Sequence, residues 1–260
     1  IARSLVREGY RTHFTYGGDI NFTNQSSYMY ATGWEELYWQ NEMSFDAPTS
    51  KWGYDDRVVC RDLTERVIRM SEEGRPFLAG WLTLSSHEPF EVPFEKFEDK
   101  IANSMAFTDD CLGEMVEQLK ASKAWENLLL VVVPDHGMGN FRRGTWSETE
   151  IHRIPMIWAG GAVKEPKVVE AYGSQIDIAA TLLAQLGIDH SDFDYSKDML
   201  DASLPKFGYY AYNEGFVVVD ERGESGWDAP SDRTTEGALE EHLVWGRPLL
   251  QQTYEDIARR

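Results

Sequence analysis

Residues 128–137 have the sequence LLLVVVPDHG, in which six aliphatic side chains run directly into a proline, a carboxylate and an imidazole. A continuous apolar run of this kind indicates a β-strand that is covered on both faces, as in a parallel sheet. Asp135 and His136 follow the carboxyl end of that strand, which is where parallel sheets gather functional residues. The stretch therefore predicts an α/β fold and also the place of its site.

The rest of the chain alternates between strand and helix patterns. Apolar runs at residues 76–86 (PFLAGWLTLSS) and 154–159 (IPMIWA) predict two more buried strands. Apolar positions at helical spacing predict three helices, over residues 62–73, 101–122 and 174–187. This alternation predicts an α/β sandwich with a largely parallel central sheet flanked by helices.

The C-terminal part has a different pattern. Residues 206–221 hold two β-rich runs, YYAY and FVVVD, separated by Asn213-Glu214-Gly215, which indicates an antiparallel hairpin. A polar loop over 224–233 and a helix over 235–259 are expected to follow. We therefore predict a catalytic-domain portion over residues 1–204, with a hairpin and helix over residues 205–260 packed on the same domain.

The charge balance restricts the partners of the chain. The 25 basic and 44 acidic residues give a net charge of −19, which disfavours nucleic acid or an anionic membrane surface as the main partner. An anionic substrate then needs a metal or a few basic residues to reverse the local field. With 42% hydrophobic residues the chain is expected to fold. Two cysteines, Cys60 and Cys111, are too few for a disulfide scaffold.

No apolar run reaches the roughly 20 residues that a membrane helix needs. The sequence has no initiator methionine and opens on IARSLVREGYRTHF, which has the pattern of a helix running into a strand. We therefore expect the chain to be a piece of a longer protein, with further segments upstream.

Asp135 and His136 are the candidate metal ligands. A carboxylate oxygen and an imidazole nitrogen suit Zn²⁺ or Mn²⁺ better than Ca²⁺ or Mg²⁺, which prefer oxygen alone. The alternative is that Asp135 caps the following turn and His136 packs locally. Two ligands do not complete a site, so others are expected from elsewhere in the fold.

Several other residues are candidates for contacts with a substrate. His87, in TLSSHEPF, stands at the end of the second apolar run and could assist proton transfer to a leaving group. Trp52, in KWGYDDR, could form a flat wall for a glycerol or sugar moiety, and Asp56 could hydrogen-bond a hydroxyl. The alternative for His87 is a structural role in a loop, and the alternative for Trp52 is ordinary core packing.

Basic residues near the Asp135-His136 turn allow two interpretations. Arg142 and Arg143 could bind a phosphate or sulfate, or they could be solvated surface charges. His152 and Arg153, which precede the IPMIWA run, carry the same ambiguity. No Walker loop, GxGxxG or GxSxG motif occurs, which disfavours nucleotide-binding and serine-hydrolase functions.

Seven landmarks in one order resemble the sulfatase-like branch of the alkaline phosphatase superfamily, and most closely its lipoteichoic acid synthase and phosphoglycerol transferase group. The resemblance covers nearly the whole chain. The landmarks are YGGDINFTN, KWGYDD, FLAGWLTLSSHEPFEVP, NLLLVVVPDHG, RIPMIWAGGAV, SQIDIAATLLAQLGI and YYAYNEGF.

The resemblance implies a mechanism and a set of roles. Such enzymes use a divalent metal, commonly Mn²⁺ with Zn²⁺, Mg²⁺ or Ca²⁺ as alternatives, to activate a threonine that attacks a phosphodiester. Asp135 and His136 match two of the metal ligands, and His87 matches the histidine at the substrate head group or leaving oxygen. Trp52 and Asp56 match the WG-x-x-D that lines the glycerol-phosphate pocket.

The resemblance also implies what lies outside the chain. The family's threonine nucleophile and a further acidic metal ligand precede the segment that matches Ile1, as do its transmembrane helices. A cell-envelope, extracytoplasmic enzyme anchored by those helices is therefore expected, acting on an anionic phosphate or sulfate ester, with a lipid or glycan head group as one form of substrate. The alternatives are a sulfatase, whose formylglycine would also lie upstream, and a non-catalytic binding module.

Overall fold

The computed structural model describes residues 1–137 and 148–259, which divide into two compact units. The first unit comprises residues 1–129 and 159–163, and the second comprises residues 130–158 and 164–260. The boundary expected between residues 204 and 205 remains a prediction about domain organisation. Each unit is described by itself.

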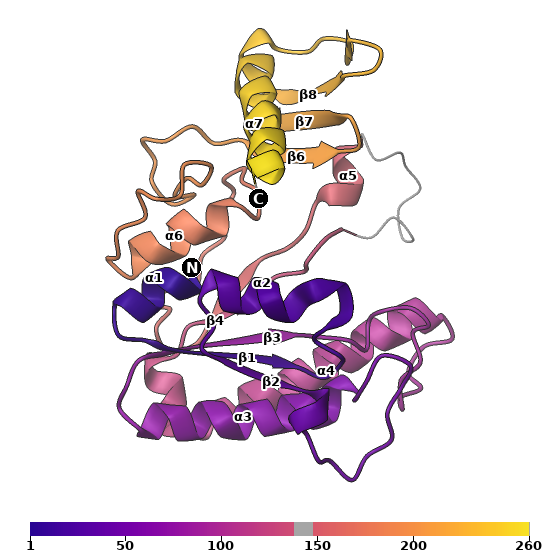
Figure 1. Cartoon of the computed structure of the whole chain (residues 1–260), viewed down its shortest axis with the longest axis vertical. Coiled ribbons are helices and arrows are strands. Elements are labelled where there is room, and N and C mark those ends of the chain that lie inside the picture. The colour runs from indigo at the N-terminus through magenta and orange to yellow at the C-terminus, as the bar shows by residue number, and fades with distance from the viewer. Residues whose placement is uncertain (138–147, 260) are drawn as a thin grey trace. The chain divides into compact units, whose positions relative to one another are not determined.

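The first unit is built on a parallel sheet with helices on both faces. Its strand order is β2-β1-β3, and both pairings are parallel, so Thr15 of β1 lies between Tyr38 of β2 and Trp81 of β3. Helices α1 and α2 cover one face and α3 covers the other (Figure 1). The elements are β1 (Arg11–Tyr16), β2 (Glu36–Trp39), β3 (Phe77–Leu82), α1 (Ala2–Arg7), η1 (Phe22–Asn24), α2 (Gln25–Thr32), η2 (Gln40–Glu42) and α3 (Asp56–Glu72).

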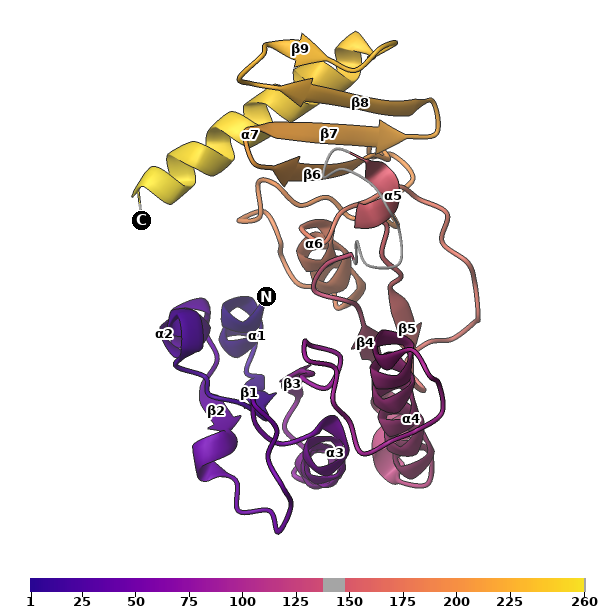
Figure 2. The same cartoon turned by 90° about the vertical axis from the view of Figure 1, so that its right-hand side faces the viewer.

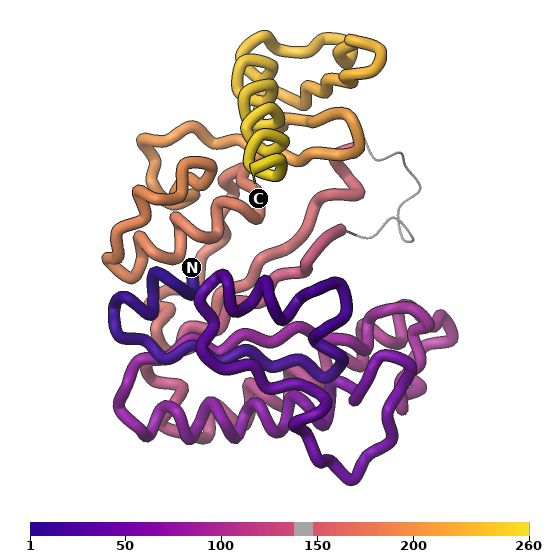
Figure 3. Tube along the Cα trace, viewed as in Figure 1, coloured from indigo at the N-terminus to yellow at the C-terminus, as the bar shows by residue number. Residues whose placement is uncertain are grey.

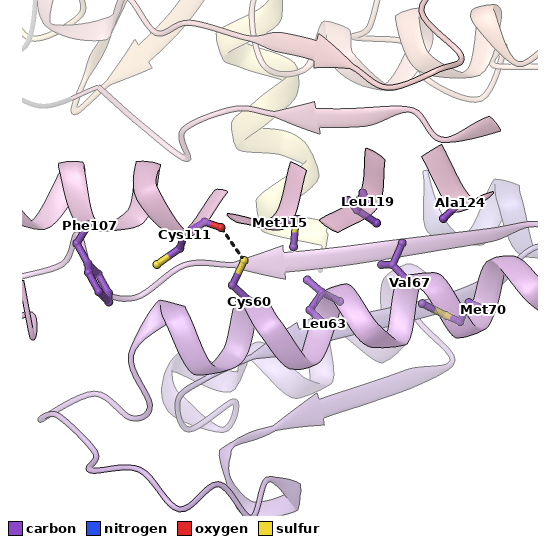
Figure 4. Packing of buried hydrophobic residues seen from close by; sticks show 9 residues of the cluster. All are labelled: Cys60, Leu63, Val67, Met70, Phe107, Cys111, Met115, Leu119 and Ala124. Carbon is purple, nitrogen blue, oxygen red and sulfur yellow. Dashed lines mark hydrogen bonds between the residues drawn. The ribbon is translucent and has the colours of Figure 1, made fainter. Parts of the chain in front are cut away.

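The main core of this unit lies between α3 and α4 (Lys100–Lys120), with η3 (Lys123–Asn127) closing one end. Figure 4 shows the apolar side chains of α3 facing those of α4 and η3. Cys60 and Cys111 are both free and buried there, and the Cys60 thiol donates to the Cys111 carbonyl at 3.3 Å. Burial raises the pKa of the Cys60 thiol to about 12 and that of Cys111 to about 11, so both thiols stay protonated at neutral pH.

The second unit contains the strand pair β4-β5 and a separate antiparallel sheet. The sheet has the order β6-β7-β8-β9, and α7 packs against it (Figure 2). Figure 3 shows the chain continuing from this sheet, which begins in orange at β6, to α7 in yellow. The elements are β4 (Leu130–Val132), α5 (Thr149–His152), β5 (Ile157–Ala159, whose last residue belongs to the first unit), α6 (Asp177–Gln185), β6 (Gly208–Tyr212), β7 (Gly215–Asp220), β8 (Gly223–Asp228), β9 (Arg233–Thr234) and α7 (Glu240–Arg259).

The predicted α/β architecture and the C-terminal hairpin and helix are confirmed, with local corrections. The segment 224–233, expected to be a loop, contributes β8 and β9, because β8 pairs along its whole length with β7 and Trp227 packs on Phe216. The helix predicted from residue 174 begins at Asp177, and the Ser174 hydroxyl is bonded to the backbone of Tyr209. In the first case pairing with β7 makes a strand of a polar segment, and in the second the bonds to Tyr209 hold Ser174 outside the helix.

The strands predicted to be buried on both faces are only half-buried in this chain. Every residue of β3 and β4 has intermediate exposure, and Ile157 of β5 is 57% exposed. Within the described residues β3 pairs with β1 alone, so one of its edges lacks a hydrogen-bonded strand. A search of the described helices finds none with the length and apolar character needed to cross a bilayer.

Candidate functional site

The Asp135–His136 turn follows β4 in the second unit, as the sequence predicted. Both side chains are open to solvent, at 68% and 75% exposure. The Nδ1–H of His136 donates to the Gly137 carbonyl at 2.8 Å, which leaves the lone pair on Nε2. That nitrogen lies 3.5 Å from Oδ2 of Asp135. In the neutral imidazole, two exposed electron-pair donors therefore lie 3.5 Å apart, close enough for both to bind one cation.

A divalent metal fits this pair by donor type. Carboxylate oxygen with neutral imidazole nitrogen is a donor set typical of Zn²⁺ and Mn²⁺, and the hydrogen bond to Nδ1 is the outer contact that metal-bound histidines usually make. Within the described residues no group of three or more His, Cys, Asp or Glu side chains is placed to hold a metal. If a metal binds at this turn, Asp135 and His136 would supply only two of its ligands, and the others would have to come from elsewhere.

Gly137 is required by the close approach of α5. A Cβ atom at this position would lie 1.8 Å from the Ile151 carbonyl oxygen and 3.2 Å from the Cα of His152. The first of these distances is far inside van der Waals contact, so no side chain fits. The backbone of α5 therefore packs directly against the residue whose carbonyl orients His136.

Trp52 and His87 meet in the first unit although 35 positions separate them in the sequence. Their ring centroids lie 4.8 Å apart in an edge-on arrangement. The Glu88 carbonyl accepts hydrogen bonds from the Trp52 indole at 2.5 Å and from Nδ1 of His87 at 2.9 Å. His87 is exposed, and the bond to Nδ1 leaves its Nε2 able to hold or accept a proton.

Phe22 joins this aromatic pair and was missed by the sequence analysis. Its ring packs edge-on against Trp52 at 5.6 Å, and the residue is 56% exposed. Phe22 is the first residue of η1, and in the preceding loop Asp19 accepts hydrogen bonds from the backbone and side chain of Asn21. The only available signal was an aromatic residue just beyond a strand end, which alone does not identify a site.

Asp56 has a different position from the one expected. Its side chain is 1% exposed and lies in the first turn of α3. The carboxylate accepts hydrogen bonds from the backbone N–H groups of Leu84 and Ser85, at 2.8 and 3.1 Å, and from the Thr108 hydroxyl at 2.8 Å. A carboxylate so occupied does not reach a substrate hydroxyl. Asp56 instead holds the segment that leads from β3 to His87.

The structure thus brings together Trp52 with His87 in one unit and Asp135 with His136 in the other. Arg142 and Arg143 lie outside the described residues, so their phosphate-binding role remains a prediction. His152 stacks on Tyr210, with ring centroids 3.9 Å apart and an angle of 23° between the planes.

Comparisons with known proteins identify relatives of this chain. Phosphoglycerol transferase I of Xanthomonas campestris pv. campestris (strain B100) is 24% identical over 216 residues, which are 77% of this chain and 31% of the relative. This chain therefore spans about a third of that relative's length.

Two solved structures share the fold. The lipoteichoic acid synthase LtaP from Listeria monocytogenes superposes with a TM-score of 0.81 at 19% identity, covering 99% of this chain and 72% of that one. A protein in the alkaline phosphatase superfamily from Vibrio parahaemolyticus gives a TM-score of 0.78 at 22% identity, with 94% and 64% coverage. The family model described as Sulfatase matches residues 1–188, and the chain belongs to the sulfatase family.

Proposed function

We propose that this chain is part of a metal-dependent phosphoglycerol transferase of the cell envelope, which acts on an anionic phosphodiester. The observation that carries the proposal is the Asp135–His136 pair, whose acceptor atoms lie 3.5 Å apart with Nδ1 of the histidine already bonded. The likeness to a phosphoglycerol transferase over 77% of the chain supports the reaction class.

In this proposal Asp135 and His136 hold a divalent metal, with Mn²⁺ expected. The metal, when bound, would supply positive charge that stabilises the phosphoryl oxygens and lowers the pKa of the attacking hydroxyl. The nucleophile is a threonine N-terminal to Ile1, as the family resemblance implies. The chain's own contribution is to fix the two ligands through the His136–Gly137 hydrogen bond and the contact of Gly137 with α5.

His87 and Trp52 supply the substrate contacts in the proposed reaction. With Nδ1 donating to Glu88, Nε2 of His87 is the atom that would transfer a proton to the leaving oxygen, a step that starts from the imidazolium form and leaves the neutral imidazole with its Nδ1–H still bonded to Glu88. Trp52 presents an apolar ring edge-on to His87, suited to the carbon backbone of a glycerol moiety. Arg143 is proposed as a further contact to the phosphate.

The sulfatase alternative gains nothing from the cysteines of this chain. Sulfatases need a cysteine or serine converted to formylglycine, but Cys60 and Cys111 are 2% and 1% exposed in the α3–α4 core. Neither cysteine is therefore open to conversion, and in the sulfatase alternative the formylglycine is expected upstream of Ile1, as the threonine of the transferase is.

The test is an assay of a longer polypeptide that contains this chain and the segment before Ile1. Matched nitrophenyl phosphodiester and sulfate ester substrates are supplied with Mn²⁺, and Asp135→Asn is compared with the parent. Phosphodiester turnover that disappears in Asp135→Asn supports the proposal. Turnover of the sulfate ester alone would replace it by the sulfatase, and metal binding without turnover of either ester would favour the binding module.

A further inference from the structure

We propose that strand β6 positions the Asp135–His136 turn from two sides, through Gln175 and through Tyr210. The inference rests on the proposed function only in taking the turn as a metal site. All of the residues involved belong to the second unit. Neither Gln175 nor Tyr210 is a proposed ligand, so both are positioning residues.

The first contact is made by the side-chain amide of Gln175. Its Nε2 donates to two successive carbonyls of the turn, to Pro134 at 2.7 Å and to Asp135 at 2.8 Å. The neighbouring Ser174 is bound to β6, because its hydroxyl donates to the Tyr209 carbonyl at 2.8 Å and accepts from the Tyr209 N–H at 2.6 Å. Two consecutive residues therefore connect the β6 backbone to the backbone of Asp135.

The second contact is made by the side chain of Tyr210. Its ring stacks on His152, and its hydroxyl lies 3.3 Å from the Thr149 hydroxyl. Thr149 and His152 are the first and last residues of α5, so Tyr210 contacts both ends of this one-turn helix. Burial raises the pKa of the Tyr210 hydroxyl to about 12, which keeps it protonated and able to donate.

The position of α5, which Tyr210 holds, affects His136 through Gly137. Its backbone lies against Gly137 so closely that a Cβ there would be 1.8 Å from the Ile151 carbonyl oxygen. The Gly137 carbonyl in turn accepts from Nδ1 of His136 at 2.8 Å. A shift of α5 would therefore move the acceptor that sets the orientation and tautomer of the imidazole.

The alternation of side chains along β6 lets one strand serve both purposes. The Tyr209 side chain belongs to the apolar cluster with Phe216, at 6.0 Å between ring centroids, while the next side chain, Tyr210, meets α5. The antiparallel sheet and α7 anchor β6, because Phe216 and Val218 of the neighbouring β7 are completely buried under α7. A rigid sheet thus supports an otherwise exposed turn.

The experiment uses the 260-residue chain and the variants Gln175→Met and Tyr210→Leu. Gln175→Met keeps the length of the side chain and removes the amide donor, and Tyr210→Leu removes the stacked ring. Mn²⁺ is titrated, and the apparent Kd is read from paramagnetic broadening of the His136 imidazole resonances. We expect each variant to weaken Mn²⁺ binding by about tenfold or more, the effect usual for outer-shell changes. Tyr210→Phe, which keeps the ring, should restore most of the affinity.

Matched substitutions elsewhere in the unit control for general destabilisation. Gln251→Met removes an amide that bonds Glu255 on the surface of α7, and Tyr254→Leu removes a 52% exposed ring on the same helix. Both should leave Mn²⁺ affinity unchanged. Circular dichroism and thermal unfolding confirm that each variant is folded before its affinity is compared.

A metal-free measurement separates this inference from the proposed function. In the absence of Mn²⁺, the imidazole resonances of His152 should move when the Tyr210 ring current is removed, and those of His136 should move in both variants. If the parent and Asp135→Asn bind Mn²⁺ equally, the metal centre of the proposed function fails, and the imidazole resonances alone decide the positioning role. Unchanged His136 resonances in both Gln175→Met and Tyr210→Leu would overturn it.

Discussion

The two candidate histidines, His87 in the first unit and His136 in the second, are oriented by the same kind of local hydrogen bond. In each case Nδ1 donates to the carbonyl of the next residue, at 2.9 Å from His87 to Glu88 and at 2.8 Å from His136 to Gly137. Each residue thereby directs Nε2 outward with its lone pair available in the neutral form. One short backbone contact per histidine sets the chemistry of the exposed nitrogen.

The proposed division of labour between these histidines predicts different effects of substitution. In the longer, active polypeptide, His87→Ala should lower kcat by about 10²–10⁴-fold, since it removes a proton donor in the transition state. The Kd for Mn²⁺ should stay the same, because His87 is not a proposed ligand. Steady-state kinetics with a parallel metal titration measure both quantities, with His190→Ala as a control. Loss of metal affinity in His87→Ala would show that its role is wrongly assigned.

Asp56 should matter for stability because its buried carboxylate accepts three hydrogen bonds. Asp56→Asn replaces one acceptor oxygen by a donor amide that faces N–H groups, so we expect a loss of about 2–4 kcal/mol in the free energy of unfolding. Urea denaturation measures the loss. Asp109→Asn, on the exposed face of α4, is the control and should change stability by less than about 0.5 kcal/mol.

Protonation of the Asp220 carboxyl should account for part of the loss of stability of the second unit in acid. Burial alone would raise the pKa of Asp220, but hydrogen bonds from Arg222 and His242 outweigh it and lower the pKa to about 2. The folded pKa is thus below the ordinary value of 3.8, so the stabilisation is present above pH 4 and is lost as the pH falls toward 2. Because Arg222 is 44% exposed, solvent screening leaves about 1 kcal/mol.

Unfolding midpoints of the parent and Asp220→Asn between pH 6 and pH 2 test this prediction. The parent should be the more stable of the two above pH 4, and the difference should shrink progressively below that value. A difference that stays constant down to pH 2 would contradict a lowered pKa for Asp220.

The contacts of single residues explain how far the sequence could predict the site. The place of Asp135 and His136 directly after a strand could be predicted from the sequence, because adjacent residues after an apolar run need no tertiary information. The meeting of Trp52 with His87 depends on two loops that approach only in the folded unit, and the burial of Asp56 depends on Ser85 and Thr108. Gln175 carried no sequence signal, since an amide becomes specific only through the carbonyls that it reaches.

Among the elements, the strongly periodic helices were predicted well and the polar strand was not. The helix expected over 101–122 is observed as α4 at Lys100–Lys120, because its apolar stripe faces α3. The helix expected from residue 62 begins at Asp56, since Asp55 accepts from the N–H groups of Arg57 and Val58 as an N-cap. Strand β8, with the sequence GESGWD, forms because β7 offers it an edge, which a polar sequence does not reveal.

Two helical glycines should respond to alanine in opposite directions. Gly246 of α7 lies against Phe216, and a Cβ there would be 1.9 Å from the ring, so Gly246→Ala should destabilise the protein by about 1–3 kcal/mol through overpacking. Gly113 of α4 has nothing within 4 Å of a Cβ, so Gly113→Ala should stabilise it by about 0.5–1 kcal/mol through helix propensity.

Thermal and urea unfolding of the two glycine variants provide the comparison. Stabilisation by Gly246→Ala would mean that α7 does not pack on Phe216 as described. Destabilisation by Gly113→Ala would mean that the exposed face of α4 is covered in solution.

At the scale of the whole molecule the dominant property is the charge of −19. Self-repulsion of that size destabilises a compact chain, whereas its ion pairs are mostly half-exposed and contribute about 0–1 kcal/mol each. Arg11, for example, pairs with Glu36 and Glu73, whose side chains are 44% and 54% exposed. Repulsion should therefore outweigh the attractive pairs in the response to salt.

We accordingly expect the Tm to rise when NaCl is raised from 10 mM to 300 mM, since the Debye length falls from about 30 Å to about 6 Å. Differential scanning calorimetry in EDTA, which removes specific metal binding, measures the rise. The triple variant Glu91→Gln, Glu95→Gln, Glu98→Gln carries a net charge of −16 instead of −19 and should show a smaller rise. A Tm that falls with salt would show that attractive ion pairs, and not net repulsion, determine the electrostatic stability of this chain.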